Sequence, residues 1–334
     1  DRRTDPVMTD GGKGNDRDPR ADRDPRADRD PRADPDPRAD RDGPPGWEPG
    51  APVEAGHGPA WSASWARTSA DELDYWLAFA QAACDAADEI ALRHFRRDLE
   101  VMTKPDRSFV TAADQAIERL IRERVRAAFP DHGLVGEEYG TEAGEARIRW
   151  YIDPIDGTHN YIRGVPLFGT LLALEIDGEL QLGVVSAPAL RERWYARRGG
   201  GAWAVGAAGM EGPRAIHVSR VATIADAQLL YGSGHEIEAS GKAPGFHDLL
   251  GEVWRERGFG DFWGYALLAE GAAEGMVEVD LSAWDMAAPL VLIEEAGGRV
   301  TDLEGRRRID SGTLLASNGL LHDELLARLA GPSG

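Results

Sequence analysis

The sequence has very little cysteine and no long apolar segment. Cys84 is the only cysteine among 334 residues, so no disulfide can form within the chain, and we expect a reducing, cytoplasmic environment. No run of about 18 apolar residues occurs, and the first residues contain no apolar signal-peptide core, so we expect neither a membrane span nor a leader. Basic residues are too few to balance the acids: the formal net charge is -20 at pH 7, which argues against nucleic acid or an anionic membrane as a partner.

Large apolar residues are almost absent from the first part of the chain. From Asp18 to Arg41 a six-residue unit repeats, DPRADR with one DPRADP variant. Such a segment cannot bury enough surface to offset the entropy of ordering, so we expect a solvated spacer, with a docking role as the alternative. A linker rich in proline and glycine follows. We therefore assign residues 1–68 to a disordered tail and linker, and residues 69–331 to a folded region with halves at 69–190 and 191–331.

Several chemical features coincide in one segment, WYIDPIDGTHNY at 150–161. Its apolar start, rich in aromatic and β-branched residues, predicts a buried strand, and Pro154 then favours a turn. Asp153 and Asp156 flank that turn, and two carboxylates so close repel each other unless a cation lies between them. The following Gly157-Thr158 pair is expected to begin a helix, whose first N–H groups can hold a phosphate. Ligands for a hard cation beside an anion site are what phosphate ester hydrolysis requires.

Three further acids lie where strands or helices are expected to begin or end. Glu137 falls in a short predicted strand, Leu134–Glu138, although a solvated acidic turn is the alternative for a Glu-Glu pair. Asp285 precedes an apolar helix, where an N-cap is its ordinary role. Asp114 falls in the first turn of a predicted helix and is equally well explained by the helix dipole. None of these three signals is specific alone.

The predicted helices and strands are mixed along the folded region. Capping signals at Ser69 and Thr111 predict two early helices. An Asp-Gly pair predicts a hairpin between strands at Leu167–Ile176 and Leu180–Ser186. Later helices are predicted at 262–273, 285–296 and 322–329, and later strands at 276–279, 299–301 and 314–317. Hairpins and crossovers together predict a layered α/β fold.

Four motifs in order resemble those of the inositol monophosphatase family of metal-dependent phosphatases. They are KPDRSFVTAADQAIE (104–118), GEEYG (136–140), WYIDPIDGTHNY (150–161) and WDMAAPLVLIEEAGG (284–298). The resemblance extends over about residues 70–330. It implies an αβαβα sandwich of the inositol monophosphatase and fructose-bisphosphatase type. It also implies hydrolysis of small phosphate monoesters that depends on Mg²⁺, with two or three ions bound, and a homodimer.

The resemblance also implies roles for single residues. The implied metal ligands are Glu137, Asp153, Asp156, Asp285 and the backbone carbonyl of Ile155. Thr158, oriented by Asp114, would position and activate the attacking water. The amides of Gly157 and Thr158 would bind the phosphoryl oxygens of the substrate, where charge spreads in the transition state.

The substrate is suggested by motifs of the second half, GDFWGYALLAEG (260–271) and SNGLLHDELLARL (317–329), which look most like the bacterial histidinol-phosphatase branch of the family. Asp261 and Glu270 add negative charge beside the expected substrate pocket. Histidinol phosphate carries an amine and an imidazole that can both be cationic, whereas inositol offers only hydroxyl groups. The alternatives are an N-cap for Asp261 and a salt-bridged acid at a helix end for Glu270.

Two basic residues have open roles. Arg257 approaches the phosphate or is a surface charge, and His159 contacts substrate or is solvated. From the resemblance and the acidic pocket we predict a Mg²⁺-dependent histidinol-phosphate phosphatase of histidine biosynthesis. The alternative is an inositol-1-monophosphatase or a broader small-ester phosphatase. A non-catalytic phosphate-binding protein is a third class, and the complete set of acids counts against it.

Overall fold

The computed structural model describes residues 69–97, 101–103, 109–142, 147–206 and 212–331. They belong to one compact unit of the chain, Ala60–Gly334. The predicted tail and linker at 1–68 lie outside the described residues. Within the described part, no helix combines the length and the apolar character that crossing a membrane requires.

The larger sheet has eight strands in the order β10-β9-β8-β7-β6-β5-β3-β4. Its strands are β3 (Gly133–Gly136), β4 (Gly140–Glu142), β5 (Ile148–Asp156), β6 (Gly169–Ile176), β7 (Glu179–Ala187), β8 (Glu192–Arg197), β9 (Ala202–Val205) and β10 (Arg214–Ile216). β3 and β5 run parallel, so the carboxyl ends of both strands reach the same edge of the sheet. The predicted boundary between the two halves, at residues 190 and 191, falls between β7 and β8, which are neighbouring strands of this one sheet.

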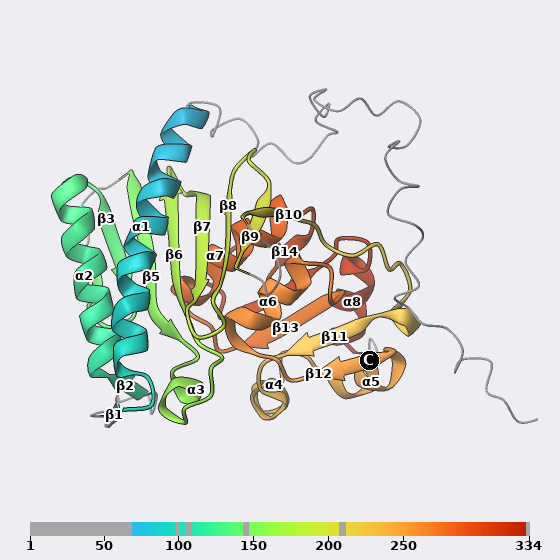
Figure 1. The fold of residues 1–334 in the computed structure, drawn as a ribbon. Helices are drawn as coiled ribbons and strands as arrows, with labels where there is room; N and C mark the ends of the chain where they lie inside the picture. The colour runs from blue at the N-terminus through green and yellow to red at the C-terminus, as the bar shows by residue number, and fades with distance from the viewer. Residues whose placement is uncertain (1–68, 98–100, 104–108, 143–146, 207–211, 332–334) are drawn as a thin grey trace, which may run out of the picture. The chain divides into compact units, whose positions relative to one another are not determined.

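Two long helices, α1 (Ala70–His94) and α2 (Ala112–Ala128), cover one face of this sheet (Figure 1). Both begin at the predicted capping boxes, on Ser69 and Thr111. The small hairpin of β1 (Val101–Thr103) and β2 (Phe109–Thr111) precedes α2. The apolar sides of both helices pack on the sheet, and Cys84 is fully buried there. The start of α2 therefore lies on the same rigid support as the strands.

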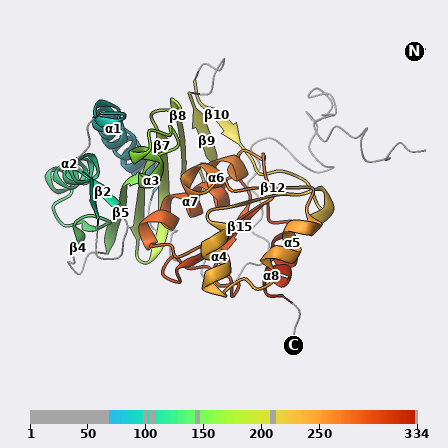
Figure 2. The same cartoon turned by 90° about the horizontal axis from the view of Figure 1, so that it is seen from below.

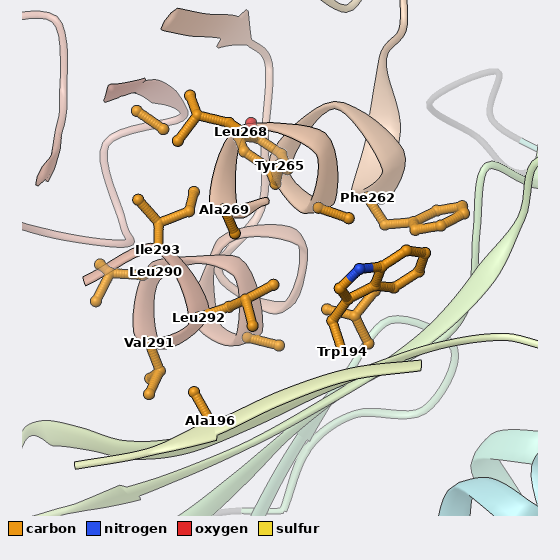
Figure 3. Close-up of a cluster of buried hydrophobic side chains, with 14 of the residues drawn as sticks. Trp194, Ala196, Phe262, Tyr265, Leu268, Ala269, Leu290, Val291, Leu292 and Ile293 are labelled. Carbon is orange, nitrogen blue, oxygen red and sulfur yellow. The ribbon is translucent and has the colours of Figure 1, made fainter. Parts of the chain in front are cut away.

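The opposite face of the large sheet is covered by α6 (Asp261–Ala269) and α7 (Ala283–Glu295). These helices pack in turn on a five-stranded sheet of order β12-β11-β13-β15-β14. Its strands are β11 (Gln228–Tyr231), β12 (Arg255–Arg257), β13 (Gly275–Val279), β14 (Arg299–Thr301) and β15 (Thr313–Ser317). Because α7 is enclosed between two sheets, it is apolar on nearly all sides. Figure 3 shows its side chains Leu290–Ile293 packed beneath α6, with Trp194 beside Phe262.

The remaining helices complete the layers. They are α3 (Thr158–Ile162), α4 (Gly234–Ser240), α5 (Phe246–Glu252), α8 (His322–Leu329) and the 3-10 helix η3 (Ile224–Asp226). Helices α4, α5 and α8 cover the outer face of the five-stranded sheet, as Figure 2 shows from below. The resulting order of layers is the αβαβα sandwich that the family resemblance implied.

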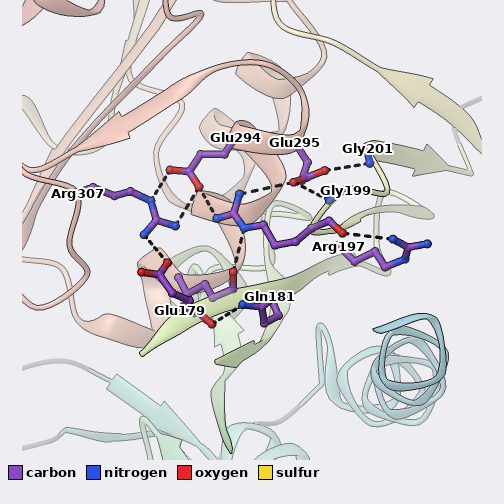
Figure 4. Close-up of polar contacts among 10 residues, drawn as sticks. Glu179, Gln181, Arg197, Gly199, Gly201, Glu294, Glu295 and Arg307 are labelled. Carbon is purple, nitrogen blue, oxygen red and sulfur yellow. Dashed lines mark hydrogen bonds and ion pairs between the residues drawn. The ribbon is translucent and has the colours of Figure 1, made fainter. Parts of the chain in front are cut away.

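The C-terminal end of α7 is tied to the large sheet by charged groups (Figure 4). Glu294 pairs with Arg198 on one side and with Arg307 on the other, where the Arg307 Nε to Glu294 Oε1 distance is 2.7 Å. Glu295 accepts hydrogen bonds from the backbone N–H groups of Gly199 and Gly201, at 3.2 and 3.0 Å. These contacts hold the axis of the helix whose other end carries Asp285.

One prediction about the central segment was wrong. Pro154 does not end the strand, because β5 continues to Asp156. Its register with β6 shifts between Asp153 and Asp156, and a proline without an N–H is tolerated at such an irregularity. The Thr170 hydroxyl also donates to the Pro154 carbonyl at 2.8 Å, which replaces part of the lost pairing. The irregularity turns the carboxylates at the end of β5 out of the regular alternation of the strand.

Candidate active site

Three carboxylates converge at the carboxyl end of β5. Asp153, Asp156 and Asp285 each place one oxygen within 4.8 Å of the others. The first two come from the end of β5, and Asp285 comes from the first turn of α7, more than a hundred residues later. Asp153 is only 2% exposed, and its Oδ1 is buried without a hydrogen-bond partner. A buried carboxylate oxygen with no donor beside it is suited to a cation ligand.

The three acids hold protons more tightly than ordinary aspartates. Burial raises the pKa of Asp153 well above its usual range, and the charges of Glu137, Asp156 and Asp285 raise it further. Burial also raises the pKa of Asp156, helped by the charge of Asp261. For Asp285, burial is again the largest cause, and its pKa rises to about 7. A divalent cation would offset this repulsion, so the donor set fits one.

Asp285 is not the N-cap of its helix, because α7 begins two residues earlier than predicted, at Ala283. Ser282 is the N-cap, and its backbone N–H donates to Asp285 Oδ2 at 2.7 Å. This reciprocal capping box fixes the carboxylate of Asp285 in the first turn, where the helix N-terminus also favours negative charge.

Glu137 lies in the turn between β3 and β4, one residue after the strand ends. Its charge raises the pKa of Asp153, Asp285 and Asp114, which places its carboxylate within electrostatic reach of all three. Glu137 is not among the three acids whose oxygens lie within 4.8 Å of one another, but its charge acts on two of them, so a purely solvated turn does not describe it.

The turn that carries Glu137 rests on a residue that the sequence analysis missed, Glu118. The Glu118 carboxylate is fully buried, accepts the N–H groups of Glu138 and Tyr139 at 2.6 and 3.2 Å, and pairs with Arg122 at 2.7 Å. A signal for it existed in the sequence, since Glu118 and Arg122 are spaced four apart on a helix beside apolar Ile117 and Ile121.

Asp114 and Thr158 meet beside the acidic cluster. The Thr158 hydroxyl lies 3.5 Å from Asp114 Oδ1 and donates to the Ile155 carbonyl at 2.9 Å. Asp114 is fully buried, and its other oxygen accepts the Thr111 N–H at 2.9 Å. Burial raises the pKa of Asp114 to about 6, against the lowering effect of the Thr111 hydrogen bonds. The pair is therefore suited to hold and pass a proton. The Ile155 carbonyl, a predicted metal ligand, lies beside it, because it accepts the Thr158 hydroxyl.

Gly157 is the N-cap of α3, which begins at Thr158 as predicted. It adopts φ +81°, a conformation that glycine reaches without strain. A Cβ at Gly157 would lie 2.9 Å from the Leu167 carbonyl and 3.3 Å from Asp261 Oδ2. The close packing leaves no room for a side chain at position 157, so the turn can offer a ligand the backbone N–H groups at 157–158 beside the Thr158 hydroxyl.

The N-terminus of α6 is the second wall of the site. The Phe262 N–H donates to Asp156 Oδ2 at 2.5 Å, which ties α6 to the acidic cluster. Asp261 is not the N-cap, because Gly260 holds that position. Asp261 is the first helical residue, and its N–H donates to Glu278 Oε1 at 3.1 Å. These contacts place the Asp261 carboxylate beside Gly157, as the acidic pocket requires.

Glu278 is a second residue that the sequence analysis missed. It is buried on β13, it accepts a hydrogen bond from the Tyr265 hydroxyl, and burial raises its pKa to about 8. The signal was a lone acid inside the apolar strand Gly275–Val279, seven residues before Asp285. A buried acid in such a strand requires polar partners. Those of Glu278 are the Tyr265 hydroxyl and the backbone N–H of Asp261, at the wall of the site.

The structure does not bring Glu270 or Arg257 into the acidic cluster. Glu270 is the C-cap of α6, about 13 Å along the helix axis from Asp261, and it accepts the Trp194 Nε1–H at 2.5 Å and pairs with Arg214. Arg257 lies on β12 and donates to the carbonyl of Glu256 at 2.6 Å. His159 is exposed on α3. Burial raises the pKa of Asp261, and the charge of His159 opposes that rise.

The chain is similar to known phosphatases over nearly all of its described part. A sequence model of the inositol monophosphatase family matches residues 72–332. Histidinol-phosphatase of Streptomyces coelicolor is 46% identical over 258 residues, which is 76% of this chain and 96% of that protein. Histidinol-phosphatase of Mycobacterium tuberculosis is 43% identical over 256 residues, with 76% and 97% covered. The crystal structure of extragenic suppressor protein suhB from Bartonella henselae superposes with a TM-score of 0.71 at 29% identity, covering 78% of this chain and 100% of that one.

Proposed function

The chain belongs to the inositol monophosphatase family and is a phosphoric monoester hydrolase, and from this premise we propose that it hydrolyses histidinol phosphate to histidinol and phosphate. The proposal includes Mg²⁺ as cofactor and a place in histidine biosynthesis. The observation that carries the choice of substrate is the Asp261 carboxylate beside Gly157, next to the acidic cluster. The names and identities of the two histidinol-phosphatase relatives support it.

The proposed metal ligands are Asp153, Asp156, Asp285, Glu137 and the carbonyl of Ile155. Oxygen atoms of this kind are the ligands that Mg²⁺ prefers. One of them, Asp153 Oδ1, has no hydrogen-bond partner within the described residues and is therefore available to a metal ion. Bound Mg²⁺ supplies positive charge that stabilises the phosphoryl oxygens in the transition state and lowers the pKa of water. The proposal sets the number of ions at two or three.

The protein's own groups then bind the phosphate and move one proton. The N–H groups at Gly157 and Thr158 donate to phosphoryl oxygens, in a helix start with no room for a side chain. The Thr158 hydroxyl takes a proton from the attacking water and passes its own proton to Asp114 Oδ1, 3.5 Å away, in place of its hydrogen bond to the Ile155 carbonyl. The water oxygen bonds to phosphorus while the ester bond to the leaving alcohol breaks, and the alkoxide so formed is protonated by solvent.

Selectivity for histidinol phosphate follows from charge. Its amine and imidazole can be cationic, and Asp261 offers a carboxylate beside the phosphate site. Glu270 stays a predicted contributor, although its pairing with Arg214 neutralises part of its charge. Inositol 1-phosphate is the alternative substrate, together with a broader range of small esters, and family membership itself favours it. A homodimer and a cytoplasmic location remain predictions from the resemblance and the composition.

Steady-state kinetics with purified protein and Mg²⁺ test the proposal. We expect kcat/KM for histidinol phosphate to exceed that for inositol 1-phosphate by at least tenfold, and the reverse order would overturn the substrate assignment. Asp153→Asn should abolish phosphate release from both esters, because a ligand of the metal is lost. Asp323→Asn is the matched control, since Asp323 on α8 is 84% exposed and its loss should leave the rate unchanged.

A further inference from the structure

Two segments that are 101 residues apart in sequence meet in one side-chain contact at the site. The Asn160 side-chain amide Nδ2 donates to Asp261 Oδ2 at 3.1 Å. Asn160 lies on α3, two residues after Thr158, and Asp261 is the first residue of α6. The contact therefore joins the helix that follows the phosphate-binding turn to the helix that forms the opposite wall.

Asp261 is held in a backbone conformation that side chains rarely adopt. Its φ is +59°, in the left-handed region, whereas the first residue of a helix normally has a negative φ. The N–H groups of Asp261 and Phe262 are both tied, to Glu278 Oε1 at 3.1 Å and to Asp156 Oδ2 at 2.5 Å. A strained position that several contacts maintain is a feature of functional sites.

Only one of the two carboxylate oxygens of Asp261 is used within the described residues. Oδ2 accepts the Asn160 amide and lies 3.3 Å from where a Cβ of Gly157 would be, whereas Oδ1 makes no hydrogen bond there. Burial raises the pKa of the Asp261 carboxyl, the charge of His159 lowers it and that of Glu236 raises it further. The carboxylate also repels the acids of this site, Asp156, Glu278 and Asp285. Oδ1 is thus the oxygen left to accept a hydrogen bond from a ligand.

We propose that Asn160 is a positioning residue: it binds Oδ2 of Asp261 and so aims Oδ1 at a cationic group of the substrate. This inference rests on the proposed function, because it needs a substrate whose alcohol part carries an ammonium or imidazolium group. An amide is suited to the task, since it supplies a neutral donor that leaves the negative charge of the carboxylate available. The backbone of Asn160 serves the α3 turn separately, through its carbonyl, which accepts the Val165 N–H at 2.9 Å.

The role requires that Asn160 act through Asp261, and a double-mutant cycle measures this. The readout is the ratio of kcat/KM for histidinol phosphate to kcat/KM for inositol 1-phosphate. We expect Asn160→Ala to lower this ratio about tenfold, mainly through KM of histidinol phosphate. Asp261→Asn should lower it at least as much. The double variant should be no lower than Asp261→Asn alone, because the oriented charge is already absent.

Two further variants separate positioning from damage to the fold. Asn160→Leu keeps about the size of the side chain but removes the donor without adding charge, so it should lower the ratio as Asn160→Ala does, with a nearly unchanged thermal unfolding temperature. Arg163→Ala changes an exposed side chain at the end of the same helix and should leave the ratio within twofold.

The outcomes are distinct. Additive losses in the cycle, or equal losses for both esters in Asn160→Ala, would overturn the role of Asn160 while the substrate assignment stands. A parent enzyme that does not prefer histidinol phosphate would overturn the substrate assignment and this inference together.

Discussion

The buried carboxylate of Glu118 accepts the backbone N–H of Glu138 at 2.6 Å. Through this bond a side chain of α2 holds the turn between β3 and β4. The same turn carries Glu137, the residue immediately before Glu138. Gly136 is part of the same contact, since a Cβ there would lie 2.1 Å from Glu118 Oε1. The position of a proposed metal ligand is therefore decided by an ion pair beneath it.

Glu118→Gln should weaken both the fold and the metal site. The change removes one of the two negative charges beside the buried Arg122, which keeps its pair with Glu142 at 2.9 Å, so the loss in the free energy of unfolding should be at most about 3 kcal/mol. The loosened turn should raise the Mg²⁺ concentration needed for half-maximal activity severalfold. Urea unfolding and a Mg²⁺ titration of the initial rate measure the two effects.

Arg126→Gln is the control for Glu118→Gln. Arg126, on the same helix as Glu118, forms an ion pair with Glu142 at the end of β4. The two side chains are 50% and 46% exposed, so loss of this pair should cost about 0–1 kcal/mol. An unchanged Mg²⁺ requirement in Glu118→Gln would show that the turn does not depend on the buried carboxylate.

Metal binding should oppose the loss of stability with rising pH that the acidic cluster creates. The pKa of Asp285 rises from 3.8 to about 7 in the fold, so the folded state keeps a proton that the unfolded state has released. Its contribution is favourable below pH 3.8 and is lost as pH rises through about 7. Without metal, stability should therefore fall as pH rises through this window. Since Mg²⁺ binds deprotonated carboxylates, its stabilising effect should grow between about pH 6 and pH 8.

Thermal unfolding across this pH range, with EDTA and with Mg²⁺, measures the difference. Asp285→Asn should remove most of it, because the titrating group and the ligand are both gone. A rise of the unfolding temperature on adding Mg²⁺ that is equal at pH 6 and pH 8 would contradict the prediction.

Gly157→Ala should cost both stability and activity. Gly157 has φ +81°, and a Cβ would come within 2.9 Å of the Leu167 carbonyl, so alanine is strained by its backbone and by its contacts. We expect a loss of about 2 kcal/mol or more and a fall in kcat of at least tenfold, as the phosphate-binding turn shifts.

Gly178→Ala is a matched control for this variant. Gly178 has nearly the same φ, +84°, in the hairpin between β6 and β7, and no atom lies within 4 Å of its Cβ position. It should lose only the conformational term, about 1 kcal/mol, with an unchanged kcat. Equal losses of activity in the two variants would contradict the role of Gly157 in the site. Unfolding in urea and steady-state kinetics provide the comparison.

His322 should limit stability in acid. It is fully buried, its Nε2 lies 2.9 Å from the Thr301 hydroxyl and its Nδ1 2.8 Å from the Ser317 hydroxyl. Because the Thr301 hydroxyl donates to the Asp302 carbonyl at 2.8 Å, it accepts from Nε2–H. Burial lowers the pKa of His322 from 6.5 to about 4. Below pH 6.5 the unfolded state gains a proton that the folded state does not, so stability falls between pH 6.5 and about 4.

The loss over that interval should reach about 3 kcal/mol at most. Urea unfolding at pH 7 and pH 4.5 measures it, and His322→Gln should reduce the slope. His247→Gln is the control, because His247 is 68% exposed and its removal should leave the slope as it is. A slope unaffected by His322→Gln would assign the acid sensitivity to other groups.

Several elements were predictable from neighbouring residues. The capping boxes at Ser69 and Thr111, the Asp-Gly hairpin and the helix that starts at Thr158 all appear where the sequence placed them. Each depends on groups within one turn of the chain, so local sequence is enough. Pro154 misled the prediction because a β-bulge, which depends on the partner strand β6, let β5 continue to Asp156.

The sequence by itself determined the type of chemistry: paired aspartates, a glycine and a threonine in one short segment, and the acids on either side of it. Only the tertiary structure decided which of those acids meet. Asp285 joins Asp153 and Asp156 because α7 is enclosed between two sheets and its first turn reaches the end of β5. Glu118 and Glu278 left a weak local signal, but their partners came only from packing, and the Asn160–Asp261 contact joins residues too distant in the chain to leave any local signal.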